Sequence, residues 1–475
     1  MKTSIVVFIF LLVAMCGFTQ DGYQIKVTLK PFTKGFLYLG HHFGSKQYII
    51  DSVAINSKSE VTFSGKEKLF GGVYMVIFPR KNGWFEMLVD KQQHFEVTAD
   101  TTDIIGKTQF YRSSDNQVFQ EYQKLAQEKG KAIAALQQRL KNNAADTDAA
   151  NIKVKIATLN EEMQQYREQF IKAHPAHLLT AIFHILQEPK VPDAAQQPGG
   201  KYDSVFAYQY YKQHYWDGVS FTDERLVRTP VFEPKLQRYF NSVLQQQPDT
   251  LSKAANKILD ASISNKEIFK FILSTLTEKY INPTYMGQDA VFVNLFERYY
   301  APGKADYWLN DKYRKAVFDR AYSVMANLIG EKAADMNMAD SSGKTVSLYS
   351  IKAPYIVICF WDPTCGHCQK EIPQLDSLYQ NKWKKRGVQI YGVMTDGGKP
   401  AWLNFIRDHQ LKGWTHVYQL PAVKEAEYAA NKPGYKQLYD VYQTPVLYLL
   451  DKDKNIIAKK LNHDQLDELL QTKWK

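Results

Sequence analysis

The sequence predicts a multidomain protein with an N-terminal antiparallel β domain, an all-helical middle domain and a C-terminal α/β domain. Up to about residue 112, apolar residues alternate with polar ones, which is the period of a half-buried strand. From residue 115 to 329 they recur at spacings of three and four, as in amphipathic helices. The last segment, 330–475, mixes near-continuous apolar runs with helical patterns around two closely spaced cysteines. At about 150 residues per domain, a chain of 475 residues accommodates three such domains.

The first residues predict export from the cytoplasm. A short basic start, Met1-Lys2, precedes the apolar core Ile5–Ala14, and polar residues follow, so we expect a secretory signal peptide over 1–20. This places the protein in the periplasm or cell envelope. A lipoprotein with a lipid anchor at Cys16 is the alternative, because the residues before Cys16 partly match a lipobox, although Met15 stands where that motif prefers a small residue.

Composition narrows the classes of partner. The net charge is +11, but the basic residues are scattered among acidic ones and form no long run, so we expect no nucleic-acid partner. The chain has four cysteines, Cys16, Cys359, Cys365 and Cys368. Such a small number in a large exported protein argues against a framework of structural disulfides.

The β domain is expected over 21–114 as a sandwich. Its first strand carries apolar residues at every second position from Tyr23 to Leu29, which predicts one buried and one solvated face. Similar runs predict further strands at 36–39, 48–55, 61–63, 73–78, 85–89 and 95–99.

The helical domain is expected over 115–329. Asp115 is the predicted N-cap of a helix that runs to Leu140, and a polar break at 142–148 separates it from a second helix over 152–170, so the two form a hairpin. Further helices are predicted at 178–186, 236–244, 254–263, 268–280, 291–300 and 313–329.

Two features of the helical domain have a functional and a structural interpretation. His174, His177 and His184 have helical spacings, but no carboxylate or cysteine joins them at ligand spacing, so we expect capping or packing roles and no metal. The aromatic stretch 202–216 is interpreted as a helix core, with an aromatic ligand or glycan site as the alternative.

The C-terminal domain is expected over 330–475 as a mixed sheet with helices on both faces. An edge strand at 344–348 precedes a strand buried on both faces at 355–361, and the helix from Cys365 ends at Gly387. The remaining predicted elements are a strand at 388–394, a helix at 401–408, a hairpin of strands at 446–450 and 456–460, and a helix at 466–470.

The dithiol Cys365-Gly366-His367-Cys368 lies where a strand enters a helix. Unpaired N–H groups and the helix dipole stabilise a thiolate there, so Cys365, first and more exposed, is the expected nucleophile. Cys368, one turn inward, resolves the mixed disulfide. Gln369 excludes a c-type haem site, and zinc would need a second cysteine pair that is absent. We therefore expect no metal and no cofactor beyond a redox-active Cys365–Cys368 disulfide.

The C-terminal domain resembles the thioredoxin fold, and more narrowly the exported TlpA/ResA-like thiol-disulfide oxidoreductases. The whole arrangement is similar to three-part proteins of Bacteroidota with a β domain, a helical domain and a thioredoxin-like domain. The resemblance is carried by Phe360-Trp361, the dithiol, Glu371, Pro373 and Thr444-Pro445.

The resemblance implies further site residues. Glu371 becomes a candidate base for the buried thiol, and Pro445, in a cis peptide, would expose the backbone of Thr444 to a substrate strand. Trp361, which precedes the motif, is assigned to substrate binding together with Thr444 and Pro445. Gly366 and His367 are expected to tune the redox potential. Cys359 replaces the buried acid of thioredoxin, and we expect it to be an inert thiol.

The function expected is disulfide exchange with protein thiols and disulfides of the cell envelope, with reduction the favoured direction. An upstream membrane protein would donate or accept the electrons. One alternative is a thiol peroxidase, whose threonine-to-cysteine spacing is absent because Thr364 is adjacent to Cys365. The other is a periplasmic binding or scaffold protein with an accessory redox module.

Overall fold

The structure, a computed structural model, describes residues 22–142 and 146–474, which divide into two compact units. The first unit holds the described residues up to Val243 together with Ser264–Ile268, and the second holds the other described residues. The segment predicted to form one helical domain over 115–329 is thus shared between them. The predicted signal peptide and Cys16 lie outside the described residues. No helix in the described ranges is long and apolar enough to cross a membrane.

The first unit begins with a β-sandwich of two four-stranded sheets, in the orders β4-β1-β7-β8 and β3-β2-β5-β6. Alternate residues of β1, such as Val27, are buried in one core with residues of the second sheet, such as Leu39. This confirms the predicted sandwich. The strands are β1 (Tyr23–Lys30), β2 (Phe36–Phe43), β3 (Lys46–Ala54), β4 (Glu60–Gly65), β5 (Gly72–Ile77), β6 (Trp84–Val89), β7 (His94–Asp100) and β8 (Gln109–Tyr111).

One strand pair of the sandwich departs from the predicted antiparallel arrangement. β1 and β7 are parallel, with Val27 opposite Val97. A parallel pair needs a crossover, and here the chain supplies it by leaving for the second sheet through β5 and β6 before it returns. Alternation along a single strand reports which face is buried but not the direction of the neighbouring strand.

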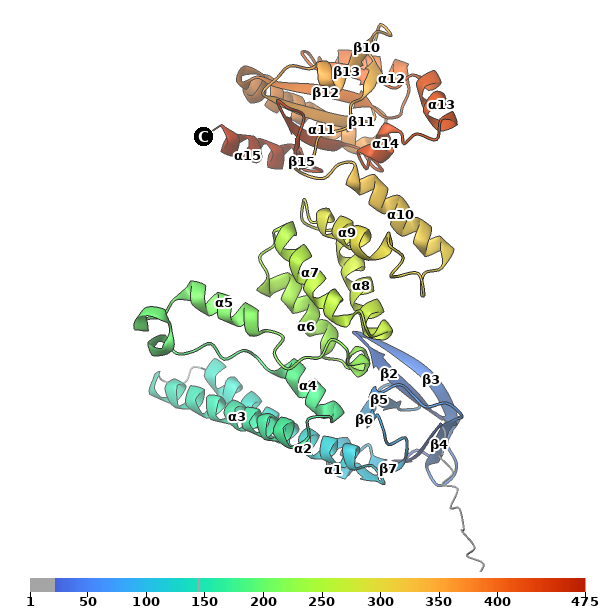
Figure 1. Cartoon of the computed structure of the whole chain (residues 1–475), viewed down its shortest axis with the longest axis vertical. Coiled ribbons are helices and arrows are strands. Elements are labelled where there is room, and N and C mark those ends of the chain that lie inside the picture. Colours follow the sequence, from blue (N-terminus) through green and yellow to red (C-terminus); the bar gives the residue numbers. More distant parts are fainter. Residues whose placement is uncertain (1–21, 143–145, 475) are drawn as a thin grey trace, which may run out of the picture. The chain divides into compact units, whose positions relative to one another are not determined.

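The predicted helical hairpin is formed by α2 (Ser114–Lys141) and α3 (Asp146–Ala173), which run side by side (Figure 1). An ion pair of 2.6 Å between Lys129 Nζ and Glu162 Oε2 joins the two helices. The hydroxyl of Tyr122 accepts a hydrogen bond of 2.8 Å from Arg167, so the pairing runs antiparallel.

The start of α2 corrects the predicted cap. Ser113, not Asp115, is the N-cap, since its hydroxyl accepts from the backbone N–H of Asn116. Asp115 lies instead 3.3 Å from His177 Nε2, and Nδ1 of His177 caps α4 (Leu178–Leu186) by accepting from the N–H of Leu179. The capping role predicted for the histidines is therefore confirmed at His177.

The aromatic stretch forms α5 (Ser204–His214) and the residues just after it. Tyr215 is buried and stacks on Tyr239 with ring centroids 5.0 Å apart, as the packing interpretation predicts. The other helices are α1 (Ile104–Lys107), α6 (Phe232–Arg238), α7 (Pro248–Ser262), α8 (Lys266–Tyr280), α9 (Asp289–Leu295) and α10 (Asp311–Met325).

The α/β domain of the second unit is built on a seven-stranded sheet in the order β10-β9-β13-β12-β11-β14-β15. Strand β11, in the interior of the sheet, is parallel to β12 and antiparallel to β14, so the sheet is mixed as predicted. The strands are β9 (Asn337–Ala339), β10 (Thr345–Ser347), β11 (Tyr355–Trp361), β12 (Val388–Met394), β13 (Thr415–Tyr418), β14 (Val446–Asp451) and β15 (Ile456–Lys459).

Both faces of this sheet are covered. Residues of β11 such as Cys359 pack with α11 (Gly366–Leu378), α12 (Lys399–Asp408) and α15 (His463–Lys473). Those of opposite parity, such as Phe360, pack with Tyr435 of α14 (Tyr435–Leu438) on the other face. The extended helical region after α11 ends at Gly387, whose positive φ of 78° confirms the predicted cap. The sequence patterns missed β13, α14 and α13 (Pro421–Ala429), which are short.

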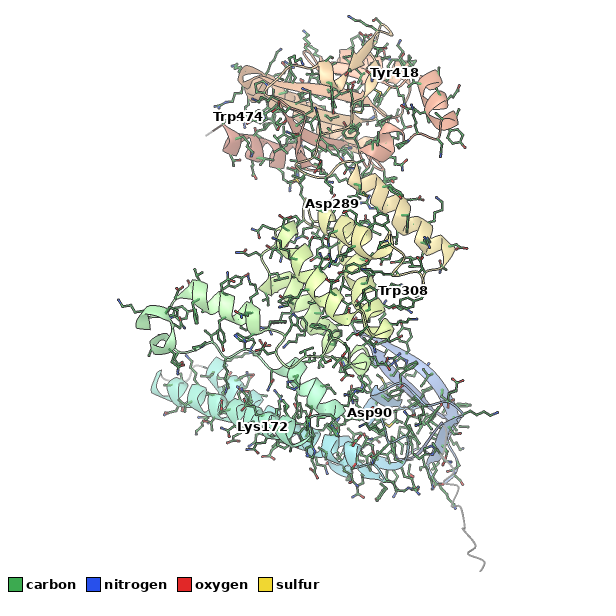
Figure 2. The ribbon with its side chains drawn as sticks, viewed as in Figure 1. Asp90, Lys172, Asp289, Trp308, Tyr418 and Trp474 are labelled. Atoms are coloured by element: carbon green, nitrogen blue, oxygen red, sulfur yellow. The ribbon has the colours of Figure 1, made fainter. Side chains whose placement is uncertain are left out.

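Helix α10 is attached to this domain within the second unit. The hydroxyl of Ser323 donates to the carbonyl of Gln437 at 3.0 Å, and the amide of Asn327 donates to that of Leu438 at 2.9 Å. Asp289, which is labelled in Figure 2, is the first residue of α9 and forms a buried ion pair with Lys459 of β15. The last helices of the helical segment and the α/β domain therefore pack as one body.

Candidate active site

The two cysteines of the motif differ in their environments. Cys365 is the N-cap residue of α11 and is half-buried, whereas the side chain of Cys368 is fully buried. Both are free thiols. The carboxylate of Asp362 shapes the turn before them by accepting hydrogen bonds from the N–H of Thr364 at 2.8 Å and from its hydroxyl at 2.7 Å. The turn at the end of β11 thus presents one sulfur atom and covers the other.

These environments shift the two thiol pKa values in opposite directions. The backbone N–H of Cys368 lowers the pKa of Cys365, with a smaller contribution from Thr444, and outweighs the opposing effect of burial. Burial raises the pKa of Cys368 to about 11, although the N–H of Asp362 donates to its sulfur at 3.4 Å. The thiolate is therefore favoured on the accessible sulfur, as the position at a helix end predicts.

The peptide bond between Thr444 and Pro445 is cis, as predicted. The residue after it, Val446, begins β14 and lies opposite Phe360 in the sheet, which brings this loop beside the end of β11. The carbonyl oxygen of Thr444 lies 3.5 Å from Cys365 Sγ and accepts its hydrogen. Strand register thus joins two segments about 80 residues apart in the chain into one site.

Trp361 does not have the substrate-binding role predicted for it. Its side chain has no exposed surface and packs against Phe405, with ring centroids 5.2 Å apart. Trp361 is buried because side chains two residues apart in a strand point to the same face of the sheet. It therefore shares with Cys359 the face of β11 that packs against α11 and α12. Cys359 is also fully buried, and burial raises its pKa well above the usual value, so its thiol stays protonated at neutral pH.

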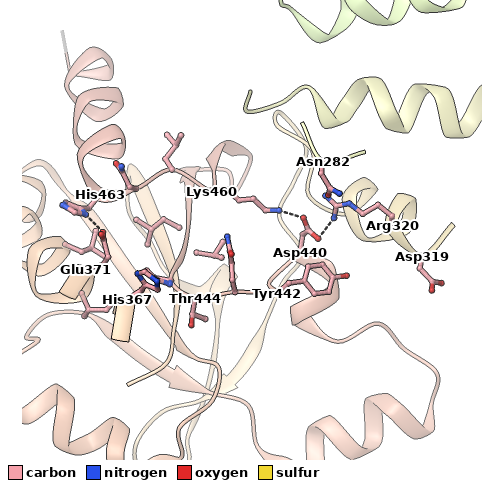
Figure 3. Close-up of a pocket in the computed structure, with 18 of the residues that line it drawn as sticks. Asn282, Asp319, Arg320, His367, Glu371, Asp440, Tyr442, Thr444, Lys460 and His463 are labelled. Carbon is pink, nitrogen blue, oxygen red and sulfur yellow. Dashed lines mark hydrogen bonds and ion pairs between the residues drawn. The ribbon is translucent and has the colours of Figure 1, made fainter. Parts of the chain in front are cut away.

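Glu371 is paired with a histidine that no sequence pattern indicated. Its Oε2 lies 2.5 Å from Nδ1 of His463, the first residue of α15 (Figure 3). The second ring nitrogen of His463 lies 3.5 Å from Asp464. Glu371 remains partly exposed, while His463 is almost fully buried. A separation of 92 residues explains why sequence reasoning missed this pair.

A cavity of about 710 Å³ adjoins the dithiol (Figure 3). His367, one of the two exposed residues between the cysteines, lies on its wall together with Glu371 and His463. The opposite wall belongs to α10. The lining is completed by Asn282, Ala316, Asp319, Arg320, Ile372, Leu375, Asp440, Tyr442, Gln443, Thr444, Pro445, Val446, Leu447, Lys460, Leu461 and Asn462.

Among the described residues, no group of three or more histidine, cysteine, aspartate or glutamate side chains is arranged to hold a metal ion. The site brings together two free thiols and the ionisable side chains of His367, Glu371 and His463 near them. A dithiol at the start of the helix after a central strand, facing a cis-proline, defines a thioredoxin-fold disulfide oxidoreductase.

Comparison with known proteins agrees with this class. The AhpC/TSA family matches residues 329–459. The thiol-disulfide oxidoreductase ResA of Bacillus thuringiensis is 30% identical over 146 residues, which cover 30% of this chain and 76% of that protein. ResA of Bacillus cereus is 27% identical over 141 residues, with 30% and 74% covered. The chain therefore belongs, through its C-terminal domain, to the ResA-like thiol-disulfide oxidoreductases.

Two further similarities add nothing to the argument about function. A solved domain described as a possible thiol-disulfide isomerase from Cytophaga hutchinsonii is 38% identical to this chain. The match covers 30% of this chain and 92% of that domain, with a TM-score of 0.27. A domain of unknown function, DUF5106, matches residues 156–321, which is most of the helical segment.

Proposed function

We propose that this thiol-disulfide oxidoreductase is exported and reduces disulfides in protein substrates of the cell envelope. The observation that carries the proposal is the contrast between the two thiols. Cys365 is accessible, has a lowered pKa and faces the cis-proline loop, defined here as residues 442–445, whereas Cys368 is buried with a pKa of about 11. Such an arrangement favours attack by one sulfur and retention of the other for the second step.

In the first step, the Cys365 thiolate attacks one sulfur of the substrate disulfide. The substrate S–S bond breaks, the departing sulfur takes up a proton, and a mixed disulfide joins the substrate to Cys365. Cys368 then loses its proton and attacks Cys365 Sγ, which releases the second substrate sulfur as a thiol. Two electrons pass from the enzyme dithiol to the substrate, and the enzyme is left with a Cys365–Cys368 disulfide.

The second step needs a group that takes the proton from a thiol whose pKa is about 11. Glu371 is three residues from Cys368 on α11, and its carboxylate is held by His463 at 2.5 Å. We assign proton transfer at Cys368 to Glu371 and positioning of that carboxylate to His463. Gly366 and His367 lie at the exposed start of α11, where they influence the potential of the dithiol.

Export and electron supply complete the proposal. The signal peptide predicted over 1–20 would deliver the chain to the periplasm or cell envelope, with a lipid anchor at Cys16 as the alternative form. Each turnover consumes a dithiol, so a membrane protein that carries a dithiol is the expected electron donor. The redox-active disulfide requires no other cofactor.

Insulin reduction in the presence of dithiothreitol tests the proposal. The wild-type chain should accelerate precipitation of the insulin B chain, and Cys365→Ser should abolish that acceleration. Cys368→Ser should instead accumulate a mixed disulfide with insulin, visible on a non-reducing gel. Cys359→Ser is the matched control and should retain activity, because this buried thiol takes no part. Full activity in Cys365→Ser would refute the assignment.

Thiol peroxidase activity is the second candidate, and the match to the AhpC/TSA family favours testing it. Hydrogen peroxide consumption coupled to dithiothreitol oxidation measures it directly. We expect turnover no faster than that of free dithiothreitol. Rapid peroxide consumption that depends on Cys365 would replace disulfide reduction as the primary activity. A binding or scaffold role for the first unit is tested by asking whether it is dispensable for insulin reduction.

A further inference from the structure

We propose that Arg320 of α10 and Asp440 form a positioning pair that holds the cis-proline loop in place beside the dithiol. Through this pair, the helical segment that precedes the thioredoxin-like domain sets the reactivity of Cys365. Both residues act through Thr444, so they are positioning residues and not catalytic ones. The inference rests on the proposed function and adds two residues from outside the motif to it.

The cis-proline loop has few contacts of its own. In the described part of the protein, neither the N–H nor the C=O of Tyr442 or Gln443 makes a hydrogen bond, and both residues are exposed. On the C-terminal side, the sheet holds the loop, because Val446 pairs with Phe360. On the N-terminal side, the chain leaves the buried carboxylate of Asp440 two residues before Tyr442. The position of the loop therefore depends on what holds its two ends.

Asp440 ties the N-terminal end of the loop to α10. Its carboxylate accepts hydrogen bonds from Arg320 and from Lys460 (Figure 3), and the hydroxyl of Ser323 donates to it at 3.3 Å. The guanidinium of Arg320 is itself oriented, since its Nε donates to the carbonyl of Ile281 at 3.0 Å. Two of these three donors belong to α10. A buried network that is satisfied in this way fixes the geometry of its members.

Thr444 transmits the position of the loop to the dithiol. Its carbonyl oxygen lies 3.5 Å from Cys365 Sγ. The backbone N–H of Cys368 has the largest effect on the pKa of Cys365, and the side chain of Thr444 lowers that pKa further. Hydrogen bonds weaken steeply with distance and misalignment, so a loop that moves away from Cys365 stabilises its thiolate less.

A positioning role and a direct electrostatic role predict opposite signs for one of two substitutions. Through space, loss of the cation in Arg320→Met disfavours the Cys365 thiolate, whereas loss of the anion in Asp440→Asn favours it. If the pair acts by holding the loop, loss of either partner releases the same segment and has the same effect. The direction of the change in Asp440→Asn therefore distinguishes the two roles.

The test measures the pH midpoint for alkylation of Cys365 by iodoacetamide in the reduced full-length chain. Arg320→Met and Asp440→Asn should each raise this midpoint by about 0.5 to 1 pH unit, as expected when a hydrogen bond to a thiolate is weakened but not lost. The variant that combines both substitutions has no unpaired charge, and its midpoint should stay raised by a similar amount. Circular dichroism checks that each variant is folded.

Asp289→Asn is the matched control. It breaks the buried ion pair with Lys459, which joins the same helical segment to the thioredoxin-like domain through β15 and not through the loop. Its midpoint should stay within about 0.2 pH unit of wild type, because distant sites act independently. A midpoint that is lowered in Asp440→Asn, unchanged in Arg320→Met and Asp440→Asn, or raised equally in Asp289→Asn would overturn the positioning role.

The proposed function is tested separately by insulin reduction with the wild-type chain. If the wild type reduces insulin but the midpoints do not follow the expected pattern, only the positioning pair is refuted. If the wild type fails to reduce insulin while the midpoints do follow it, the pair controls the reactivity of Cys365 and the proposed function is wrong.

Discussion

Replacement of the buried carboxylate at position 440 should weaken the second unit substantially. Asp440 has a positive φ of 51°, a conformation that asparagine also tolerates, so Asp440→Asn removes the charge with little change in backbone preference. The substitution leaves Arg320, whose side chain is only 16% exposed, without its anion. Lys460 loses the same partner, but its side chain is 44% exposed and water compensates it.

The expected decrease in the free energy of unfolding follows from the exposures of the Arg320 and Lys460 side chains. Breaking a buried ion pair costs about 3–5 kcal/mol. We take the lower end, about 3 kcal/mol, because Arg320 keeps a hydrogen bond of 3.0 Å from its Nε to the carbonyl of Ile281. Lys460 adds at most about 1 kcal/mol. With a urea dependence of roughly 2–3 kcal/mol per M for a unit of this size, the unfolding midpoint should fall by about 1 M.

Tryptophan fluorescence of the full chain reports this transition, because six of its eight tryptophans belong to the second unit. Lys436→Gln is the matched control, since it breaks the exposed pair with Asp396 and should cost about 0–1 kcal/mol. Asp440→Asn with Arg320→Met should recover part of the loss by removing the unpaired charge. A midpoint of Asp440→Asn equal to that of Lys436→Gln would refute the reasoning.

The same variant has an expected pH dependence. Burial acts to raise the pKa of Asp440, but Lys460 and Arg320 outweigh it and hold the pKa below its usual value. A carboxylate with a lowered pKa in the folded state stabilises the protein above its unfolded pKa of about 3.9 and loses this effect as pH falls through the folded value. The stability difference between wild type and Asp440→Asn should therefore be complete at neutral pH and shrink below about pH 4.

Three further outcomes are expected. Iodoacetamide should modify Cys365 with a pH midpoint below the value of about 8.5 for an ordinary thiol. It should leave Cys368, whose pKa is about 11, unmodified in the folded chain. Mass spectrometry of the digested protein checks both outcomes. Glu371→Gln should slow resolution of the mixed disulfide on the order of 100-fold in single-turnover kinetics. His463→Gln should slow it less, because the carboxylate of Glu371 remains. Equal rates in the wild type and both variants would exclude both residues from the reaction. Asn116→Ala should destabilise the first unit by about 1–3 kcal/mol in thermal unfolding followed by circular dichroism, since its buried amide satisfies two backbone groups of β6.

Several parts of the fold could be predicted because their signals are local. The alternation in β1 and the three-to-four spacing in α2 and α3 follow from which side chains are buried, and each is visible within about ten residues. Non-local features were missed. The parallel pairing of β1 with β7 depends on the path of the chain between the two sheets, and short elements such as β13 carry too few residues to show a period.

The candidate site likewise has features that local sequence signals predicted and features that they missed. The motif from Cys365 to Cys368 identified the dithiol, and the resemblance to the thioredoxin fold implied the cis peptide bond before Pro445; both lie where they were expected. Trp361 shows the limit of motif reasoning, because adjacency in sequence to the dithiol did not reveal that its side chain points into the core.

By itself, the sequence determined the class of chemistry, because two cysteines at the start of a helix after a buried strand constrain reactivity through local geometry and the helix dipole. Only the tertiary structure decided what surrounds them. The pairing of Glu371 with His463, the buried contact of Arg320 with Asp440 and the cavity between α10 and the cis-proline loop join segments separated by about 90 to 120 residues. Such contacts arise from packing, and no periodicity along the chain records them.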